Sequence, residues 1–275
     1  MRRALLLQLL LHPLLALGQS EPNLNDLMGA RNYGMGGAYR SVALGGEAIT
    51  GSPAALALRR RYEFELSGAF DSQTKFGYGS IAVIDSQTSD LAAGISYHFA
   101  SLGRGDQQRS VNLTTLGAAT AVTENIFIGL AVKYLLESGA VSANALTMDV
   151  GLLVRLSDSL IASFTGQNLI DIRKMDLSRY YALGLAYVTG PFTVAVDARA
   201  DFTGPSSRFA YHGGVEYVLG GAFPLRAGYA HDNILQTDFV SGGIGFAGKG
   251  GGIDFAYRHE LRDGGGRLFA LSLRL

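Results

Sequence analysis

Histidine is the first residue type to consider for chemistry, because it can bind a metal ion or transfer a proton near neutral pH. Four of the five histidines, His98, His212, His231 and His259, are far apart in the chain. Each falls on or at the end of a different short alternating segment, so a metal cluster would require several segments to meet in register. The chain has no cysteine. The pattern therefore predicts neither a metal site nor a disulfide framework.

Other catalytic patterns are incomplete. The glycines from Gly34 to Gly37 lack the Lys-Ser/Thr pair that a phosphate-binding loop needs, and Lys249, which stands among glycines, is not followed by Ser or Thr. No serine with an adjacent histidine can be selected as a hydrolase nucleophile. The sequence therefore predicts that the protein is not an enzyme and uses no cofactor.

Charged residues occur at positions that alternate with apolar ones, which would place them inside a closed sheet. The candidate lumen charges are Lys133, Asp197, Arg199, Glu216, Arg226, Asp254 and Arg258. One interpretation is that they pair with each other and with a segment inside the lumen, since a buried unpaired charge is costly. The other is a polar pathway around or through that segment. The sequence leaves both open.

The elements that would position these charges are short and alternating. About fourteen segments of roughly ten residues have the pattern of membrane-spanning strands. They are residues 62–71, 76–85, 90–100, 111–122, 126–137, 144–155, 159–168, 179–189, 191–201, 209–218, 223–232, 239–247, 251–260 and 267–275. The mean hydropathy is +0.18, yet no apolar run beyond the N-terminus is long enough for a membrane helix. We therefore expect an all-β protein, a 14-stranded antiparallel transmembrane β-barrel.

Connection lengths support a barrel. The connections at 123–125, 157–158, 189–190 and 219–222 are short, whereas those at 101–110, 137–143, 170–178 and 202–208 are longer and more polar. Outer-membrane barrels have short periplasmic turns and longer outer loops, and an even strand count returns the C-terminus to the periplasm. A soluble β-sandwich also has short alternating strands, but it has no reason to sort its loops in this way.

The N-terminal part has a different texture. Residues 1–18 have two arginines, a leucine-rich stretch and a small-residue ending, which predicts a cleaved signal peptide. Residues 19–61 are rich in Gly and Ala, and we expect them to form a plug inside the barrel of residues 62–275. The candidate plug turn is Ser52, Pro53 and Ala54, and the candidate plug glycines are Gly34, Gly36 and Gly37.

Charge and aromatic content fit an outer-membrane location. Acidic and basic residues are equal in number, which argues against a nucleic-acid partner. Outer-membrane lipid is the expected surrounding. Tyrosines near the segment ends are expected to form interfacial girdles, namely Tyr62, Tyr134, Tyr180, Tyr181, Tyr187, Tyr211, Tyr217, Tyr229 and Tyr257.

Short motifs in a fixed order resemble one superfamily. The stretch GMGGAYRSVALGGEAITGSPAAL is similar to the N-terminus of the FadL and PorV/PorQ superfamily of outer-membrane barrels. Further similar motifs are Gln167 to Leu169, Leu225 to Tyr229 and Asp254 to Tyr257. The resemblance implies fourteen strands with an N-terminal hatch in the lumen. In this sequence Ser52 replaces the Asn of the family's Asn-Pro-Ala turn.

The resemblance implies two classes of function. One is passive uptake of a small hydrophobic molecule, which would leave sideways through the wall, with Ala92 to Gly94 as the candidate opening. The alternative is an adaptor or structural subunit that docks a protein secretion or cell-surface complex, as implied by the PorV/PorQ branch. The outer loops look short, which favours the adaptor modestly and argues against fatty acids as the substrate.

Overall fold

The computed structural model describes residues 24, 27–102, 108–139, 142–170, 177–202, 208–262 and 265–275. The predicted signal peptide, residues 1–18, lies outside the described residues and stays a prediction. The first part of the predicted plug, except residue 24, lies outside them as well.

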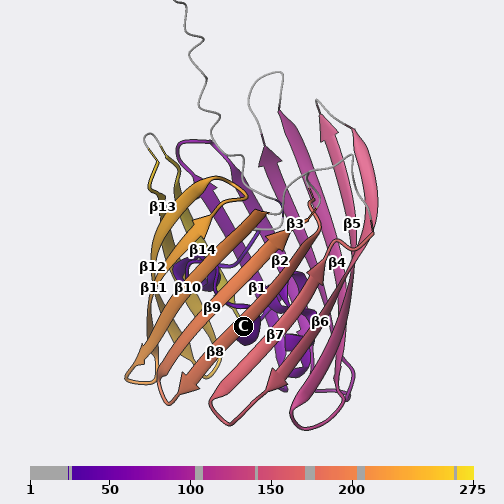
Figure 1. The fold of residues 1–275 in the computed structure, drawn as a ribbon, viewed down its shortest axis with the longest axis vertical. Coiled ribbons are helices and arrows are strands. Elements are labelled where there is room, and N and C mark those ends of the chain that lie inside the picture. The colour runs from indigo at the N-terminus through magenta and orange to yellow at the C-terminus, as the bar shows by residue number, and fades with distance from the viewer. Residues whose placement is uncertain are drawn as a thin grey trace, which may run out of the picture.

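Fourteen strands form one closed antiparallel barrel in which each strand pairs with its neighbours in sequence and β1 pairs with β14 (Figure 1). The strands are β1 Tyr62–Asp71, β2 Gly77–Asp85, β3 Ala92–Leu102, β4 Arg109–Ala121, β5 Ile126–Gly139, β6 Ala143–Arg155, β7 Leu160–Gln167, β8 Tyr180–Thr189, β9 Phe192–Asp201, β10 Arg208–Leu219, β11 Phe223–Asp232, β12 Thr237–Gly248, β13 Gly251–Glu260 and β14 Arg267–Arg274. The predicted fold class is confirmed.

Strand ends agree with the alternation of the sequence to within two residues. We call the end where β1 begins and β14 ends the short-turn end, since β8 and β9 are joined there by residues 190–191 and β12 and β13 by residues 249–250. The opposite end is the long-loop end. The prediction of a long loop at 137–143 is wrong, because β5 and β6 extend so far that only residues 140–142 connect them.

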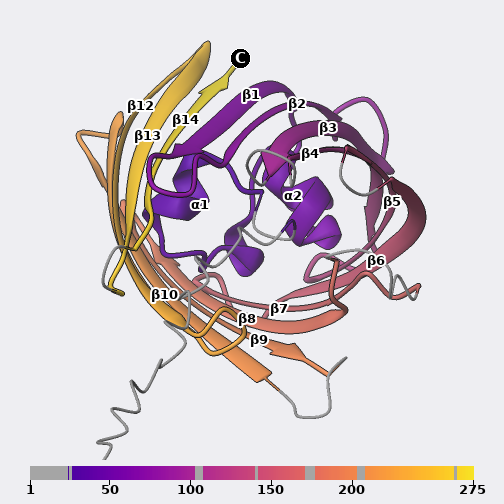
Figure 2. The same cartoon turned by 90° about the horizontal axis from the view of Figure 1, so that it is seen from above.

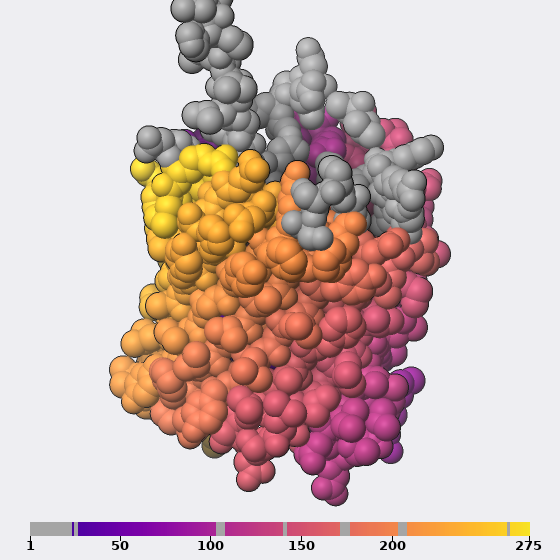
Figure 3. Space-filling view, in the orientation of Figure 1, coloured from indigo at the N-terminus to yellow at the C-terminus, as the bar shows by residue number. Residues whose placement is uncertain are grey.

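Side chains alternate between the lumen and the outside, because successive residues of a strand face opposite sides of a sheet. In β5, Phe127, Ala131 and Lys133 are buried, while Leu130 and Val132 are exposed. The exposed set around the barrel is mostly leucine, isoleucine, valine, phenylalanine and tyrosine. On the face shown in Figure 3, side chains cover the strands without an opening. An apolar exterior of this kind suits contact with lipid.

Most of the predicted girdle tyrosines point outward, but Tyr180 does not. Its side chain is fully buried, and the Arg199 guanidinium lies 4.7 Å from the centre of its ring. The prediction was wrong because Tyr180 and Tyr181 are consecutive, so only one of them can face outward. Tyr180 belongs to the lumen.

The segment of residues 27–58, here called the lumen segment, lies inside the ring of strands (Figure 2). It contains α1 Ala30–Gly34, the 3-10 turn η2 Arg40–Val42, α2 Gly46–Gly51 and the 3-10 turn η3 Pro53–Ala57. Its elements contact strands on several sides, with α1 against β12 and β13 and η3 against β4 and β5. None of the described helices is long and apolar enough to cross a membrane.

Candidate functional site

The lumen segment sits on glycines of the wall. Gly214 of β10 and Gly228 of β11 are partners in register, and both face the backbone of Met35 and Gly36. A Cβ on Gly228 would lie 2.1 Å from the Gly36 nitrogen, and one on Gly214 would lie 2.3 Å from the Met35 oxygen. Neither position has room for a side chain. The missing side chains therefore let the two backbones touch.

The predicted plug turn also packs on a pair of wall glycines. Gly129 of β5 and Gly151 of β6 are also partners in register, and Pro53 and Ala54 lie on them. A Cβ on Gly129 would lie 2.4 Å from the Ala54 nitrogen. Ser52, the first residue of the predicted turn, is fully buried, and its hydroxyl has no hydrogen-bond partner among the described residues.

The predicted plug glycines are packed tightly. Gly36 has φ +65° and Gly37 φ +83°, values that favour glycine. Gly37 lies under the ring of His212, whose Nδ1 is 2.9 Å from the Gly36 oxygen, and Gly34 ends α1 beside Gly243. All three glycines therefore allow close contact between the lumen segment and the wall.

Six of the seven candidate charges lie in β9 to β11 and β13, and three of these six form one network with α1. Arg31 of α1 donates Nε and Nη2 to the two oxygens of Glu216, at 3.1 and 3.0 Å. Arg226 lies 2.6 Å from Glu216 and 2.6 Å from Asp254, and Arg274 also pairs with Asp254. Each carboxylate thus bridges two guanidinium groups, which offsets the cost of burying the charges.

Asp197 holds η2 in place. Its Oδ2 accepts hydrogen bonds from the backbone nitrogens of Tyr39 and Arg40, at 3.0 and 3.1 Å, and pairs with the Arg40 guanidinium at 3.2 Å. Arg199 pairs with Asp232 at 3.0 Å within the wall. Of these two candidate charges, Asp197 therefore contacts the lumen segment and Arg199 supports the wall beside it.

Lys133 lies on another side of the lumen. Its Nζ is 2.6 Å from Asp149, whose other oxygen accepts the backbone N–H of Asn168 at 2.8 Å. Gln167 donates Nε2 to the Thr50 oxygen at 3.0 Å, so the Gln-Asn pair noted in the sequence joins the end of β7 to α2. The structure does not bring Lys133 together with the β10–β13 network.

Arg258 differs from the other candidate charges. Its guanidinium carbon lies 4.9 Å from the ring centre of Tyr33 in α1 and 4.4 Å from that of Phe239 in β12. A cation over the faces of aromatic rings is stabilised by their quadrupoles. Arg258 therefore contacts α1 through a ring and not through a carboxylate.

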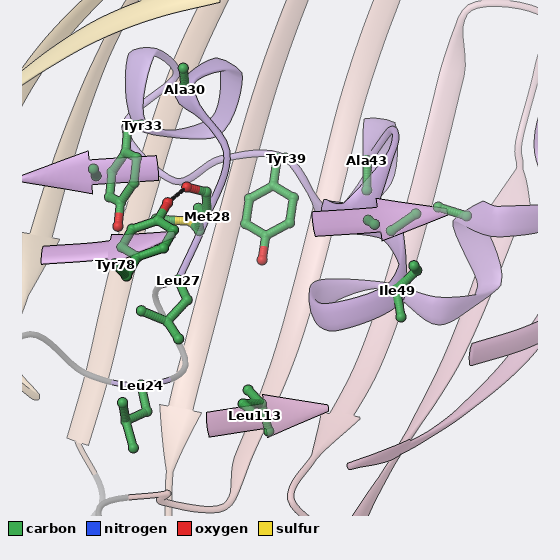
Figure 4. Packing of buried hydrophobic residues seen from close by; sticks show 14 of the residues in the cluster. Leu24, Leu27, Met28, Ala30, Tyr33, Tyr39, Ala43, Ile49, Tyr78 and Leu113 are labelled. Atoms are coloured by element: carbon green, nitrogen blue, oxygen red, sulfur yellow. Dashed lines mark hydrogen bonds between the residues drawn. The ribbon is translucent and has the colours of Figure 1, made fainter. Parts of the chain in front are cut away.

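The lumen wall is mostly apolar on the β2–β5 side towards the long-loop end, where His98 and the Arg109–Glu137 ion pair are the polar exceptions among the described residues. The apolar side chains there are buried, and they pack against Leu24, Leu27 and Met28 (Figure 4). They include Phe76, Tyr78, Ala100, Leu102, Val111, Leu113 and Leu135. Tyr78 donates its hydroxyl to the Met28 oxygen, and the buried ring of His98 lies beside it, with the two ring centres 6.5 Å apart.

The expected wall opening at Ala92 to Gly94 is wrong. These residues of β3 are paired on both sides, with β4 throughout and with β2 from Ala93 onward. Gly94 makes room for a side chain of the lumen segment instead, since a Cβ there would lie 2.8 Å from Cδ1 of Ile49. Small residues at this point of β3 serve packing and leave no gap.

A cavity of about 620 Å³ lies at the short-turn end, between the lumen segment and strands β1, β10, β11 and β12 to β14. Its lining includes Arg31, Glu216 and Arg226 of the network, and the turn Gly248 to Gly251. A second, much smaller cavity of about 10 Å³ lies beside Glu47, Glu65 and His98.

Sequence reasoning missed two groups. The first is the lumen-segment arginines Arg31 and Arg40, which are conspicuous as charges in a small-residue stretch. The second is the inward-facing wall glycines, which could be found by marking glycines at lumen-facing positions of neighbouring strands. The described residues contain no group of three or more His, Asp or Glu side chains that could hold a metal ion.

The fold defines a class of protein, the closed fourteen-stranded antiparallel barrel. Comparison of the sequence with protein-family models and with curated proteins gave no match.

Solved structures are similar in fold. The CymD monoaromatic hydrocarbon channel has a TM-score of 0.72 at 14% identity, and the match covers 90% of this chain and 96% of that one. The Pseudomonas putida toluene transporter TodX has a TM-score of 0.71 at 14% identity, with the same coverage. A Pseudomonas aeruginosa FadL homologue has a TM-score of 0.67 at 12% identity, covering 94% and 99%. This chain therefore has the barrel fold of FadL-type outer-membrane proteins.

Proposed function

We propose that this protein is a channel for passive passage of small hydrophobic molecules across a bacterial outer membrane. The observation that carries the proposal is a fourteen-stranded barrel, similar in fold to hydrocarbon channels, whose lumen is apolar on one side. The exterior belt of apolar side chains supports the membrane location. The proposal leaves the identity of the molecule to experiment.

Within this proposal the lumen segment acts as a plug. Ion pairs hold it on the β9–β13 side, through Arg31 and Arg40, whereas contacts on the β2–β5 side are mostly apolar, with a hydrogen bond from Tyr78 to the Met28 oxygen and no ion pair among the described residues. An apolar molecule can replace apolar contacts but cannot replace an ion pair. We therefore place the route of the hydrophobic molecule along the β2–β5 side, past Leu102, Leu113 and Leu135.

The adaptor alternative receives no support from the solved structures named above, whose titles describe channels, a transporter and a FadL homologue. The same titles describe no enzyme, in line with the expectation from the sequence.

Uptake of radiolabelled toluene by liposomes containing the purified protein tests the proposal. We expect faster uptake than by empty liposomes, and no faster uptake of glucose, because the charged side of the lumen is filled by the segment. Equal toluene uptake with and without protein would contradict channel activity.

A crosslink tests the role of the segment. Ser41 of η2 and Ser163 of β7 have their Oγ atoms 2.9 Å apart, and the chain has no native cysteine. The double variant Ser41→Cys/Ser163→Cys is expected to form a disulfide that ties η2 to the wall. If the molecule passes on the β2–β5 side without release of η2, toluene uptake is unchanged by oxidation; slower uptake that a reductant restores would place the moving part at η2.

A further inference from the structure

The cavity at the short-turn end is strongly basic. Its lining has six cationic side chains, Arg31, Arg59, Arg61, Arg226, Lys249 and Arg274, and two carboxylates, Glu63 and Glu216. Asp254 adds a third carboxylate behind the lining, where it bridges Arg226 and Arg274. The cavity therefore has six cationic side chains and three carboxylate side chains in or directly behind its lining, so these side chains carry a net positive charge.

Two of these cations have no side-chain partner in the part of the chain that the structure describes. Arg61 pairs with Glu63 at 2.8 Å, but the side chains of Arg59 and Lys249 form no hydrogen bond or ion pair with a described residue. The backbone of Arg59 is fixed, because its oxygen accepts the Ser86 hydroxyl at 2.6 Å. Desolvation, and then repulsion from Arg31 and Arg61, lowers the pKa of Arg59 from its ordinary value. Glu216 acts in the opposite direction, but by less than Arg31 or Arg61.

The cavity also has an apolar part. Leu44, Val218, Pro224 and Ala247 line it, and its volume lies in the range of sites that hold small organic molecules. One rim is the turn Gly248 to Gly251. A Cβ on Gly250 would meet no atom within 4 Å, so this rim borders open space.

We propose that this cavity binds a small amphiphilic oxyanion, a molecule with one carboxylate-type or phosphate-type group on an apolar body. The anionic group is bound by the side chains of Arg59 and Lys249, which line the cavity and pair with no carboxylate among the described residues. The apolar body lies against Leu44 and Val218. Because Arg31 and Arg59 belong to the N-terminal part and Arg226 and Arg274 to the wall, the ligand joins the two. The site does not depend on channel activity.

Equilibrium dialysis of the full chain in detergent tests the site with 2-naphthoate as the probe and 2-naphthol as its uncharged analogue. We expect 2-naphthoate to bind at least about tenfold more tightly than 2-naphthol at pH 7, since a hydrogen bond to a charged group contributes about that much. Binding is also expected to weaken as salt is raised. Equal binding of the two probes would overturn the proposal.

The variants are chosen outside the buried network, so the barrel stays intact. Arg59→Gln/Lys249→Gln is expected to weaken 2-naphthoate binding about tenfold. Gly250→Asp, which adds a carboxylate at the open rim, is expected to weaken it as well. Arg60→Gln is the matched control: Arg60 follows Arg59 but is not part of the lining, and it bonds to Ser89 and Asp90 instead. Loss of binding in Arg60→Gln equal to that in the double variant would contradict the site.

Competition distinguishes the sources of the anion. Displacement of 2-naphthoate by hexyl phosphate, but not by inorganic phosphate, supports an amphiphile with either head group. Displacement by inorganic phosphate alone at equal concentration would overturn the need for an apolar body. If 2-naphthoate does not bind and an acidic peptide such as hexaglutamate does, the cavity is a protein-docking surface and the proposal is wrong.

Discussion

The two sides of the lumen hold the same segment by different forces. On the β9–β14 side the inward side chains include Asp197, Glu216, Arg226 and Asp254, which bond to the segment or to each other within about 3.2 Å. On the β2–β5 side most of them are aliphatic, aromatic or small, and the charged ones, Lys133 and Glu137, pair within the wall and not with the segment. Ion pairs fix position and direction, whereas apolar contacts are non-directional. The difference separates a side anchored by ion pairs from a side held mainly by apolar contacts, which is the side where we propose that a ligand passes.

Removal of the segment is expected to have the largest effect. A fourteen-stranded barrel is wide enough to leave a water-filled lumen when it is emptied. Deletion of residues 27–58 should therefore raise the single-channel conductance in planar bilayers severalfold and let small polar solutes enter liposomes. A deletion variant that folds and conducts no better than the intact chain would show that the segment does not occlude the lumen.

The next largest effect is expected on the anchored side. Glu216→Gln removes the carboxylate between Arg31 and Arg226, which are both buried. Breaking one partner of a buried ion pair costs about 3–5 kcal/mol, because the remaining charges lose their compensation. The free energy of unfolding, from urea titration in lipid vesicles, should fall by that amount. Glu124→Gln, in the exposed turn between β4 and β5, is the control and should change it by less than about 0.5 kcal/mol.

On the apolar side the cost should come from a cavity. Leu113 is buried in the cluster against the segment, so Leu113→Ala is expected to cost about 2–5 kcal/mol, the range of large-to-small core substitutions. The same substitution widens the route that we place on this side. Leu113→Ala should therefore speed toluene uptake, whereas Glu216→Gln, on the other side of the lumen, should not widen this route. Slower toluene uptake by Leu113→Ala would contradict the placement of the route.

Substitution of a wall glycine that contacts the lumen segment should change the free energy of unfolding by less. Gly214→Ala would place Cβ 2.3 Å from the Met35 oxygen, whereas Gly213→Ala, one residue earlier in β10, meets nothing within 4 Å. Forced repacking of this kind typically costs about 1–3 kcal/mol. We expect Gly214→Ala to lower the free energy of unfolding by that amount and Gly213→Ala to leave it nearly unchanged. Equal effects of the two variants would mean that the close contact between Gly214 and the Met35 backbone does not stabilise the position of the segment.

The sequence predicted the barrel well because a two-residue alternation specifies both the strands and the face of each side chain. β1, β11 and β13 match their predicted bounds without a shift. The partners of the lumen charges could not be predicted, since Asp197 is 157 residues from Arg40 and only the closed barrel brings them together. The false opening at Ala92 to Gly94 has the same cause: small residues in a strand are equally suited to a gap and to the close approach of Ile49.

The smallest effect is expected at Ser52, where the resembling family has Asn. The Ser52 hydroxyl is buried and has no hydrogen-bond partner among the described residues, although its backbone oxygen accepts the Ala55 N–H at 2.9 Å. A buried hydroxyl without a partner contributes its desolvation cost and no bond. Ser52→Ala should therefore leave the free energy of unfolding unchanged or raise it by up to about 1 kcal/mol.

Thr165→Ala is the matched comparison on the wall, because the Thr165 hydroxyl is also buried without a partner among the described residues. It additionally removes a methyl group, so it should be less favourable than Ser52→Ala. A loss of more than about 1 kcal/mol in Ser52→Ala would show that this hydroxyl has a partner, such as a bound water, at the turn that rests on Gly129 and Gly151.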